Sequence, residues 1–251
     1  MRLFGVSGRE NGERPSPLLS CANQFEMSSW TRSRAKRAVD VGMVLVLSPL
    51  WLPVLAAVAL AVCLISGPPV LFRQQRAGLN GGLFVIYKFR TMRRGSASPT
   101  SAIATDSADR ITWLGKLLRK SKMDELPQII NVFVGDMSLV GPRPKVPEQQ
   151  PEPLPCRPGL TGPATLAFAR EEVILQSVAP DELEDYYYNT ILPAKARLDG
   201  DYLRSATVWT DLRILVNTVT GRWETYRWDA SWLLHKQKHL EGASQTASLS
   251  Q

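Results

Sequence analysis

The sequence is poor in the residues on which several common kinds of site depend. Its 251 residues include two histidines and three cysteines, and the cysteines stand far apart along the chain. This composition excludes a disulfide framework and a CxxC metal site, disfavours a histidine-based triad or zinc centre, and is typical of a reducing compartment. Hydrophobic residues make up 44% and charged residues 21%, which excludes wholesale disorder.

Charge is missing from one long stretch of the chain. No Asp, Glu, Lys or Arg occurs from Val41 to Phe72, and the apolar part of this stretch, Val41 to Ser66, has 26 residues. As one helix it would be about 39 Å long, enough to cross a bilayer. The alternative is a buried helix of a soluble core, but soluble helices of this length normally have a polar face, and this one has none. We therefore predict a membrane segment.

The flanks of this stretch predict how it meets the membrane. Basic side chains stand on both sides of it, with Asp40 as the one acid: Arg32, Arg34, Lys36 and Arg37 before, and Arg73, Arg76, Lys88, Arg90, Arg93 and Arg94 after. Because positive flanks stay in the cytoplasm, a straight span would place one of them on the wrong side. Pro49 removes a helical hydrogen bond, so we expect a bend there, with Ser48 bonded to a freed carbonyl. The prediction is a re-entrant helix over residues 31–67, with a single span as the alternative.

The other segments predict a small α+β domain that is mainly helical. Two apolar runs with glycines between them predict a β-hairpin between Pro69 and Thr91. The domain is expected to cover residues 68–222, after a mobile lead-in at 1–30 and before an aromatic, basic extension and polar tail at 223–251. The aromatic residues of 223–240 either lie on the membrane surface or pack on the domain. Amphipathic surface helices are expected from Thr112 to Lys120, from Ser121 or Asp124 past Phe133, and over Asp181–Thr190, Lys195–Arg204 and Val208–Val219.

Charge is divided unevenly between the two halves. Residues 1–122 carry 18 basic and 6 acidic side chains, whereas residues 123–251 carry 12 and 17. The first half is therefore expected to face an anionic partner: a phosphorylated ligand, a lipid surface or nucleic acid. A nucleic-acid-binding protein would explain the charge but not the uncharged stretch, and no helix-turn-helix or stacked-aromatic RNA motif is evident. We therefore expect no nucleic-acid partner.

Three short motifs could carry chemistry. Asp124 and Glu125 are adjacent carboxylates at a predicted helix start after three basic residues, where one could accept a phosphoryl group and the other could hold Mg²⁺. Arg143 lies between two prolines, which would hold its guanidinium ready for a phosphate. Lys88 and Arg90 alternate around an aromatic residue at the end of the hairpin. Taken singly, each also fits a plain explanation: an acidic first turn, a surface turn or a solvated strand end.

Together these motifs resemble the bacterial sugar transferases of the monotopic phosphoglycosyl transferase superfamily, in their short, single-domain form. The resemblance covers about residues 34–222. It is carried by KRAVD (36–40), SP (48–49), GPPVLFRQQRAG (67–78), YKFRTM (87–92), LLRKSKMDELPQIINVFVGDMSLVGPRP (117–144) and RPGLTGPA (157–164). The order of residues in the 28-residue block is highly specific.

The resemblance implies a reaction and a place in the cell. Such enzymes transfer a sugar 1-phosphate from a nucleotide diphosphate sugar, usually a UDP-sugar, to a polyprenyl phosphate such as undecaprenyl phosphate. This is the first membrane step of surface glycans such as exopolysaccharide, at the cytoplasmic face of the bacterial inner membrane. The family's Asp-Glu dyad falls on Asp124, as covalent nucleophile, and Glu125, as Mg²⁺ ligand. Its phosphate-binding arginines fall on Arg119 and Arg143, to which the basic pair Lys88 and Arg90 is added.

A second hypothesis from another class is a catalytically inactive membrane adaptor. Such a protein would bind polyprenyl phosphate or anionic lipid through its basic first half. The intact Asp124-Glu125 pair argues against it, because an adaptor has no need of the dyad. A homo-oligomer is compatible with either hypothesis, and the sequence identifies neither the sugar nor the pathway.

Overall fold

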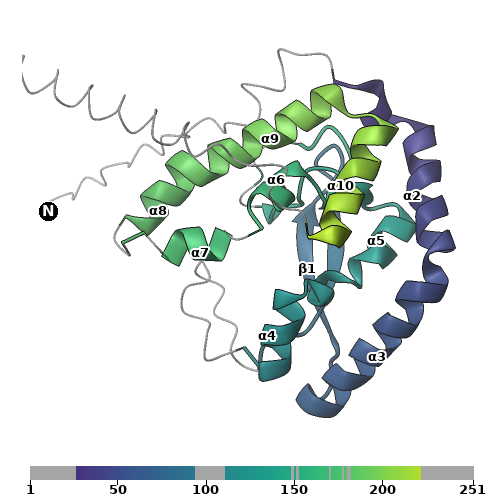
Figure 1. The fold of residues 1–251 in the computed structure, drawn as a ribbon, viewed down its shortest axis with the longest axis vertical. Coiled ribbons are helices and arrows are strands. Elements are labelled where there is room, and N and C mark those ends of the chain that lie inside the picture. Colours follow the sequence, from purple (N-terminus) through teal and green to yellow (C-terminus); the bar gives the residue numbers. More distant parts are fainter. Residues whose placement is uncertain are drawn as a thin grey trace, which may run out of the picture.

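The computed structural model describes residues 27–93, 111–147, 150, 153–169, 171–176, 178–179 and 182–221. The expected lead-in, apart from residues 27–30, and the aromatic extension lie outside this part of the chain. Within it the fold is mainly helical, with one β-hairpin and one long apolar helix (Figure 1), so the expected α+β class is confirmed.

The uncharged stretch forms two helices instead of one. A short 3-10 turn, Ser29–Arg32, leads into α2 (Arg34–Val46), and α3 (Ser48–Ser66) follows after Leu47. The two helices meet at an angle (Figure 1), and the Ser48 hydroxyl donates to the Leu45 carbonyl at 2.7 Å. Pro49 stands at the start of α3, where a missing N–H costs little. The bend and its serine hydrogen bond are therefore where the sequence predicted them.

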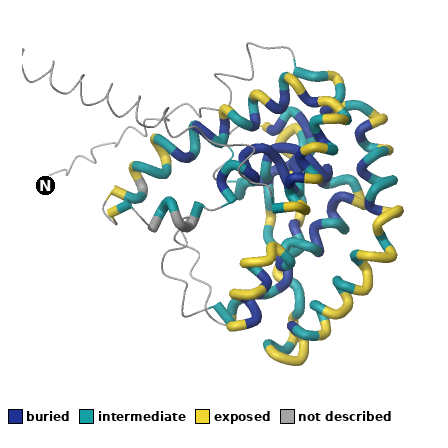
Figure 2. The backbone as a smooth tube through the Cα atoms, viewed as in Figure 1, coloured by how far each residue is buried: buried dark blue, intermediate teal, exposed yellow. Residues whose placement is uncertain are grey.

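Most of α3 faces away from the protein. Val62 is fully buried, whereas Leu50, Leu60 and Leu64 are exposed (Figure 2). Among the described residues, α3 alone is long and apolar enough to cross a membrane. Such a surface is stable only in an apolar surrounding or against a partner.

Strands are few and short. The hairpin pairs β1 (Leu71–Ala77) with β2 (Leu83–Phe89) in antiparallel register, with Arg73 opposite Tyr87. Asn80 and Gly81 make its turn with positive φ angles of 55° and 80°. A second, parallel pair joins β3 (Ser138–Val140) to β4 (Gly159–Thr161).

The segment between the hairpin and β3 departs from the prediction. Helix α4 (Trp113–Lys120) is capped as expected, because the Thr112 hydroxyl accepts from the Gly115 N–H at 2.9 Å. The next helix was predicted to begin at Ser121 or Asp124, and this is wrong. Lys122 has a left-handed backbone (φ 58°) that stops the chain from continuing as a helix. A 3-10 turn, η3 (Met123–Glu125), follows, and α5 (Gln128–Val134) begins after Pro127.

The C-terminal half consists of helices around the second strand pair. The helices over Asp181–Thr190 and Lys195–Arg204 were predicted as separate, with Pro193 as the break between them, and this is wrong. Helix α9 takes Pro193 into its first turn and continues from a π-helical turn, which accommodates the altered hydrogen bonding. The elements are α6 (Pro163–Ala167), α7 (Glu171–Gln176), α8 (Leu183–Tyr186), the π turn η5 (Tyr187–Ile191), α9 (Leu192–Ser205) and α10 (Val208–Thr220).

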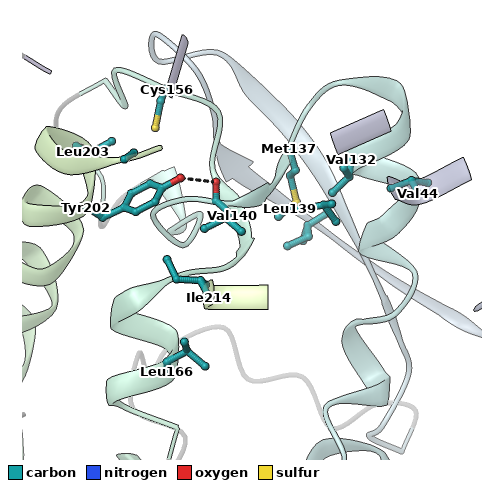
Figure 3. Packing of buried hydrophobic residues seen from close by; sticks show 12 residues of the cluster. Val44, Val132, Met137, Leu139, Val140, Cys156, Leu166, Tyr202, Leu203 and Ile214 are labelled. Atoms are coloured by element: carbon teal, nitrogen blue, oxygen red, sulfur yellow. Dashed lines mark hydrogen bonds between the residues drawn. The ribbon is translucent and has the colours of Figure 1, made fainter. Parts of the chain in front are cut away.

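Three apolar clusters hold these elements together, one of them formed by Phe168, Ile191 and Ala194 of the C-terminal half. The main core joins α2, α5, the β3–β4 pair, α9 and α10, and in it the Tyr202 hydroxyl lies 3.2 Å from the Val140 carbonyl (Figure 3). A smaller cluster packs Val62 of α3 against Phe89, Leu114 and Leu118 of the hairpin and α4. The long apolar helix is thereby attached to the domain along one face.

A buried ion pair fixes α2 against the C-terminal helices. The Lys36 ammonium binds the Asp211 carboxylate, and both side chains are less than a tenth exposed. The same carboxylate accepts from the Trp30 indole at 2.8 Å and from the Tyr202 hydroxyl at 2.7 Å. All the partners of a buried charge are thus supplied by the protein, which is the condition under which such a pair is tolerated.

Removing this carboxylate is expected to destabilise the whole fold. Asp211→Ala leaves the Lys36 ammonium buried without a counterion, so we expect a loss of about 3–5 kcal/mol, seen as a lower thermal midpoint in detergent. The matched control is Asp201→Ala, which breaks the more exposed pair with Arg204 and is expected to cost less than about 1 kcal/mol. Equal effects of the two substitutions would contradict the structural role of Asp211.

Candidate active site

The Asp124-Glu125 pair lies in a tight turn between two helices. The left-handed backbone of Lys122 and the following 3-10 turn direct both carboxylates inward, and Asp124 is only 9% exposed. Pro127 then starts α5, which packs into the main core through Val132. The turn is therefore fixed on both sides, and the two carboxylates have little freedom.

Glu125 is the point at which three segments meet. Its Oε1 accepts from the Lys88 ammonium of β2 at 2.8 Å and forms an ion pair with the Arg143 guanidinium of the Gly-Pro-Arg-Pro segment. Burial alone would raise the pKa of Glu125, but Arg143 and Lys88 outweigh it and lower the pKa to about 2. Burial lowers the pKa of Lys88, and Glu125 opposes this. Glu125 is therefore ionised throughout the physiological range.

Asp124 has a different environment from its neighbour. Burial and the negative charge of Glu125 raise its pKa, whereas Lys88, Arg119 and Lys122 act in the opposite direction. In the part of the chain that the structure describes, its carboxylate has no hydrogen-bond partner. A carboxylate surrounded by cations but bonded to none of them keeps its oxygens available as a nucleophile.

The backbone around Arg143 is anchored to its neighbours. The Gly141 N–H donates to Thr161 at 2.9 Å, and the Gly159 N–H donates to Pro142 at 2.8 Å. These contacts require two glycines, because a Cβ on Gly159 would lie 2.1 Å from the Gly141 nitrogen. The RPGLTGPA motif therefore has a physical task, which is to hold the Arg143 segment in place.

Arg76 is a site residue that the sequence reasoning missed. Its guanidinium donates to the Pro144 carbonyl at 3.3 Å, and the adjacent Ala77 N–H donates to Lys145 at 3.0 Å. Burial lowers the pKa of Arg76, as does Arg143 nearby, while Glu125 raises it. The signal that could have found it is its place in the RQQRAG stretch that ends β1.

The other two predicted phosphate-binding arginines lie in different places. Arg119, at the end of α4, donates from Nε to the Thr91 hydroxyl at 3.0 Å and is close enough to Asp124 to affect its pKa. Arg90 binds the carbonyls of Ser66 and Gly67 at the C-terminal end of α3. The structure thus brings Arg119 to the carboxylate pair but uses Arg90 to hold the apolar helix. Phosphate binding by either arginine stays a prediction.

A metal ion at this place would depend on the two carboxylates. No group of three or more Asp, Glu, His or Cys side chains that could hold a metal occurs among the described residues. Mg²⁺ commonly uses one or two carboxylates together with water and substrate phosphates. The pair therefore fits Mg²⁺ only as part of a set that a phosphate ligand completes.

Comparison with known proteins identifies the family of this chain. A model of the family described as "Bacterial sugar transferase" matches residues 31–224. The chain therefore belongs to the bacterial sugar transferase family, and the expected resemblance is confirmed.

Three relatives show how much of this chain is shared with them. UDP-glucose:undecaprenyl-phosphate glucose-1-phosphate transferase of Caulobacter vibrioides is 38% identical, over 73% of this chain and 68% of that protein. The Escherichia coli protein of the same name is 36% identical over 73% of this chain, but only 39% of that protein is covered. Exopolysaccharide production protein PSS of Rhizobium leguminosarum is 35% identical over 74% of this chain and 94% of its own length.

The opposed environments of the two carboxylates can be tested by titration. Glu125→Gln removes the negative charge that helps raise the pKa of Asp124, so the Asp124 pKa is expected to fall. The measurement is a ¹³C NMR titration of aspartate-labelled protein in micelles. Asp136→Asn is the control, because Asp136 does not contribute to the Asp124 pKa. An Asp124 pKa that stays constant or rises in Glu125→Gln would contradict the assigned coupling.

Proposed function

We propose that this chain transfers a sugar 1-phosphate from a UDP-sugar to undecaprenyl phosphate. The observation that carries the proposal is the buried carboxylate of Asp124, which has no hydrogen-bond partner among the described residues, beside the Glu125, Lys88 and Arg143 cluster. The names of the relatives support UDP-glucose as donor, and a relative from Aeromonas hydrophila, 33% identical, supports UDP-N-acetylgalactosamine as the second choice. The activity class is that of a phosphoglycosyl transferase.

The proposed reaction has two displacements at one phosphorus atom. An Asp124 carboxylate oxygen attacks the sugar-linked phosphorus, the bond to the UMP oxygen breaks, and UMP leaves. A phosphate oxygen of undecaprenyl phosphate then attacks the same phosphorus, and the Asp124–phosphorus bond breaks. The product is undecaprenyl diphosphate sugar, and Asp124 is regenerated. No oxidant or reductant is needed, and the covalent intermediate lets a soluble donor and a lipid acceptor use one site in turn.

The cations around the pair would stabilise the charge that develops on the diphosphate. Arg143, Lys88 and Arg119 come from three different segments, so they can contact a diphosphate from several sides. When bound, Mg²⁺ would neutralise phosphate charge at Glu125 and the substrate oxygens. The low pKa of Glu125 supports this assignment, because a metal ligand must be ionised.

We place the protein on the inner membrane, with its active site on the cytoplasmic face. The exposed apolar surface of α3 supports membrane insertion, and the basic residues before α2 and after α3 support entry and exit on one face. The bend at Ser48-Pro49 would turn the segment back before it crosses the bilayer. This arrangement would keep Asp124 at the surface where the acceptor phosphate lies.

The nucleophile is tested by replacing it with its amide. Asp124→Asn should keep the fold and abolish UMP release, because an amide does not form the acyl phosphate. Wild-type enzyme incubated with donor alone should release about one UMP per chain and gain the mass of one sugar phosphate. Asp136→Asn is the matched control and should retain turnover. Near-normal activity of Asp124→Asn would contradict the mechanism, and binding of undecaprenyl phosphate without any UMP release by the wild type would favour an inactive adaptor.

The re-entrant arrangement is tested by labelling from the two sides of the membrane. Single cysteines at residue 30 and within residues 95–105 should both react with an impermeant maleimide only in inside-out vesicles. Pro49→Ala should favour a straighter helix and bring part of the population to a true span. Reaction of the two positions from opposite sides in the wild type would show that the segment crosses.

A further inference from the structure

The Glu125 carboxylate, the expected ligand of the metal, is already neutralised by cations of the chain itself. Lys88 and Arg143 both bind its Oε1. The two cations differ in their surroundings: the Lys88 side chain is 22% exposed, whereas that of Arg143 is 42% exposed. Arg143 is therefore the partner that can leave with less rearrangement.

The wider charge balance also opposes binding of a lone metal ion. Five cations act on the two carboxylates: Arg76, Lys88, Arg119, Lys122 and Arg143. A divalent cation that arrives alone meets a net positive environment in a partly buried site, where such repulsion is screened less than in bulk water. A diphosphate reverses this balance, because it brings negative charge and oxygen ligands together.

We propose that Arg143 masks Glu125 from the metal until a diphosphate binds and draws the guanidinium away. Guanidinium groups pair well with phosphate oxygens, often through two parallel hydrogen bonds. Once Arg143 has moved to the diphosphate, Glu125 keeps Lys88 as its ion-pair partner among the described residues and gains affinity for Mg²⁺. This inference rests on the proposed function, since it assumes a diphosphate donor and a divalent cation at the site.

The exchange couples two ligands through one side chain. If the diphosphate raises the affinity for the metal, the metal must raise the affinity for the diphosphate by the same factor. Metal and donor would then bind together. In the protein without donor, the ion pair of Arg143 with Glu125 would prevent a metal ion from binding to Asp124 and Glu125 in the absence of substrate. Arg143 is thus assigned two roles, counterion of the metal ligand and binder of the donor phosphate.

The test measures metal binding without turnover. Mn²⁺ replaces Mg²⁺, and free Mn²⁺ is counted by electron paramagnetic resonance in protein without nucleotide. Arg143→Met should bind Mn²⁺ at least about tenfold more tightly than the wild type, because it removes a unit positive charge next to the ligand. Arg73→Met is the matched control: this arginine lies on the same hairpin as Lys88 but over the Tyr87 ring, and its removal should leave Mn²⁺ affinity unchanged.

Unchanged or weaker Mn²⁺ binding by Arg143→Met would overturn the proposal. If that variant does not give the wild-type circular dichroism spectrum, Arg143→Gln is measured in its place, with the same expected gain in affinity. The result does not depend on sugar transfer. A protein that releases UMP from UDP-sugars but shows no gain in Mn²⁺ affinity would keep the proposed function and lose this inference.

Discussion

One carboxylate oxygen, Oε1 of Glu125, holds the active site together. It joins the end of β2, through Lys88, to the turn before α5 and to the Gly-Pro-Arg-Pro segment, through Arg143. Lys88 and Arg143 lie 37 and 18 positions from Glu125 in the sequence, and the three segments share no continuous strand or helix. Because the oxygen is charged and largely buried, its negative charge has to be compensated by partners of the chain, and both cations contribute to this. The cluster that is proposed to bind a diphosphate is thus also the link between the parts of the site.

A second buried carboxylate links the domain to the apolar helices. Asp211 on α10 pairs with the Lys36 ammonium of α2 and accepts hydrogen bonds from the Trp30 indole and the Tyr202 hydroxyl. These buried polar contacts at the start of α2 orient this helix, which leads into the bend at Leu47 and the apolar helix α3. Helix α3 itself packs against the hairpin and α4 along one face.

The sequence predicted the elements that depend on local signals. The hairpin follows from its apolar runs and glycines, α4 from its threonine cap, and the bend from Ser48-Pro49. The start of α5 was missed because the chain is broken at Lys122, and a lysine gives no sign of a left-handed backbone, which is usually left to glycine or asparagine. The break expected at Pro193 was wrong because a proline in a first turn costs little.

In the candidate site, too, the features that depend on local motifs were predicted and the contacts between distant segments were not. Asp124, Glu125 and Arg143 stand in motifs that could be recognised in the sequence, but the ion pairs of Glu125 depend on a fold that brings distant segments together. Arg90 illustrates the difference, because its basic character predicted phosphate binding, while the structure pairs it with the carbonyls that end α3. No local pattern contains that contact, which links residues 23 and 24 positions apart.

This contact also connects the membrane segment to the chemistry. Arg90 holds the last carbonyls of α3, and the next residue, Thr91, is buried and accepts a hydrogen bond from Arg119. Arg119 in turn acts electrostatically on Asp124. Two hydrogen-bonding residues and one electrostatic interaction thus connect the end of the apolar helix with the proposed nucleophile. If α3 is inserted as proposed, this connection would fix the position of Asp124 relative to the membrane, which the proposed transfer to a lipid phosphate requires.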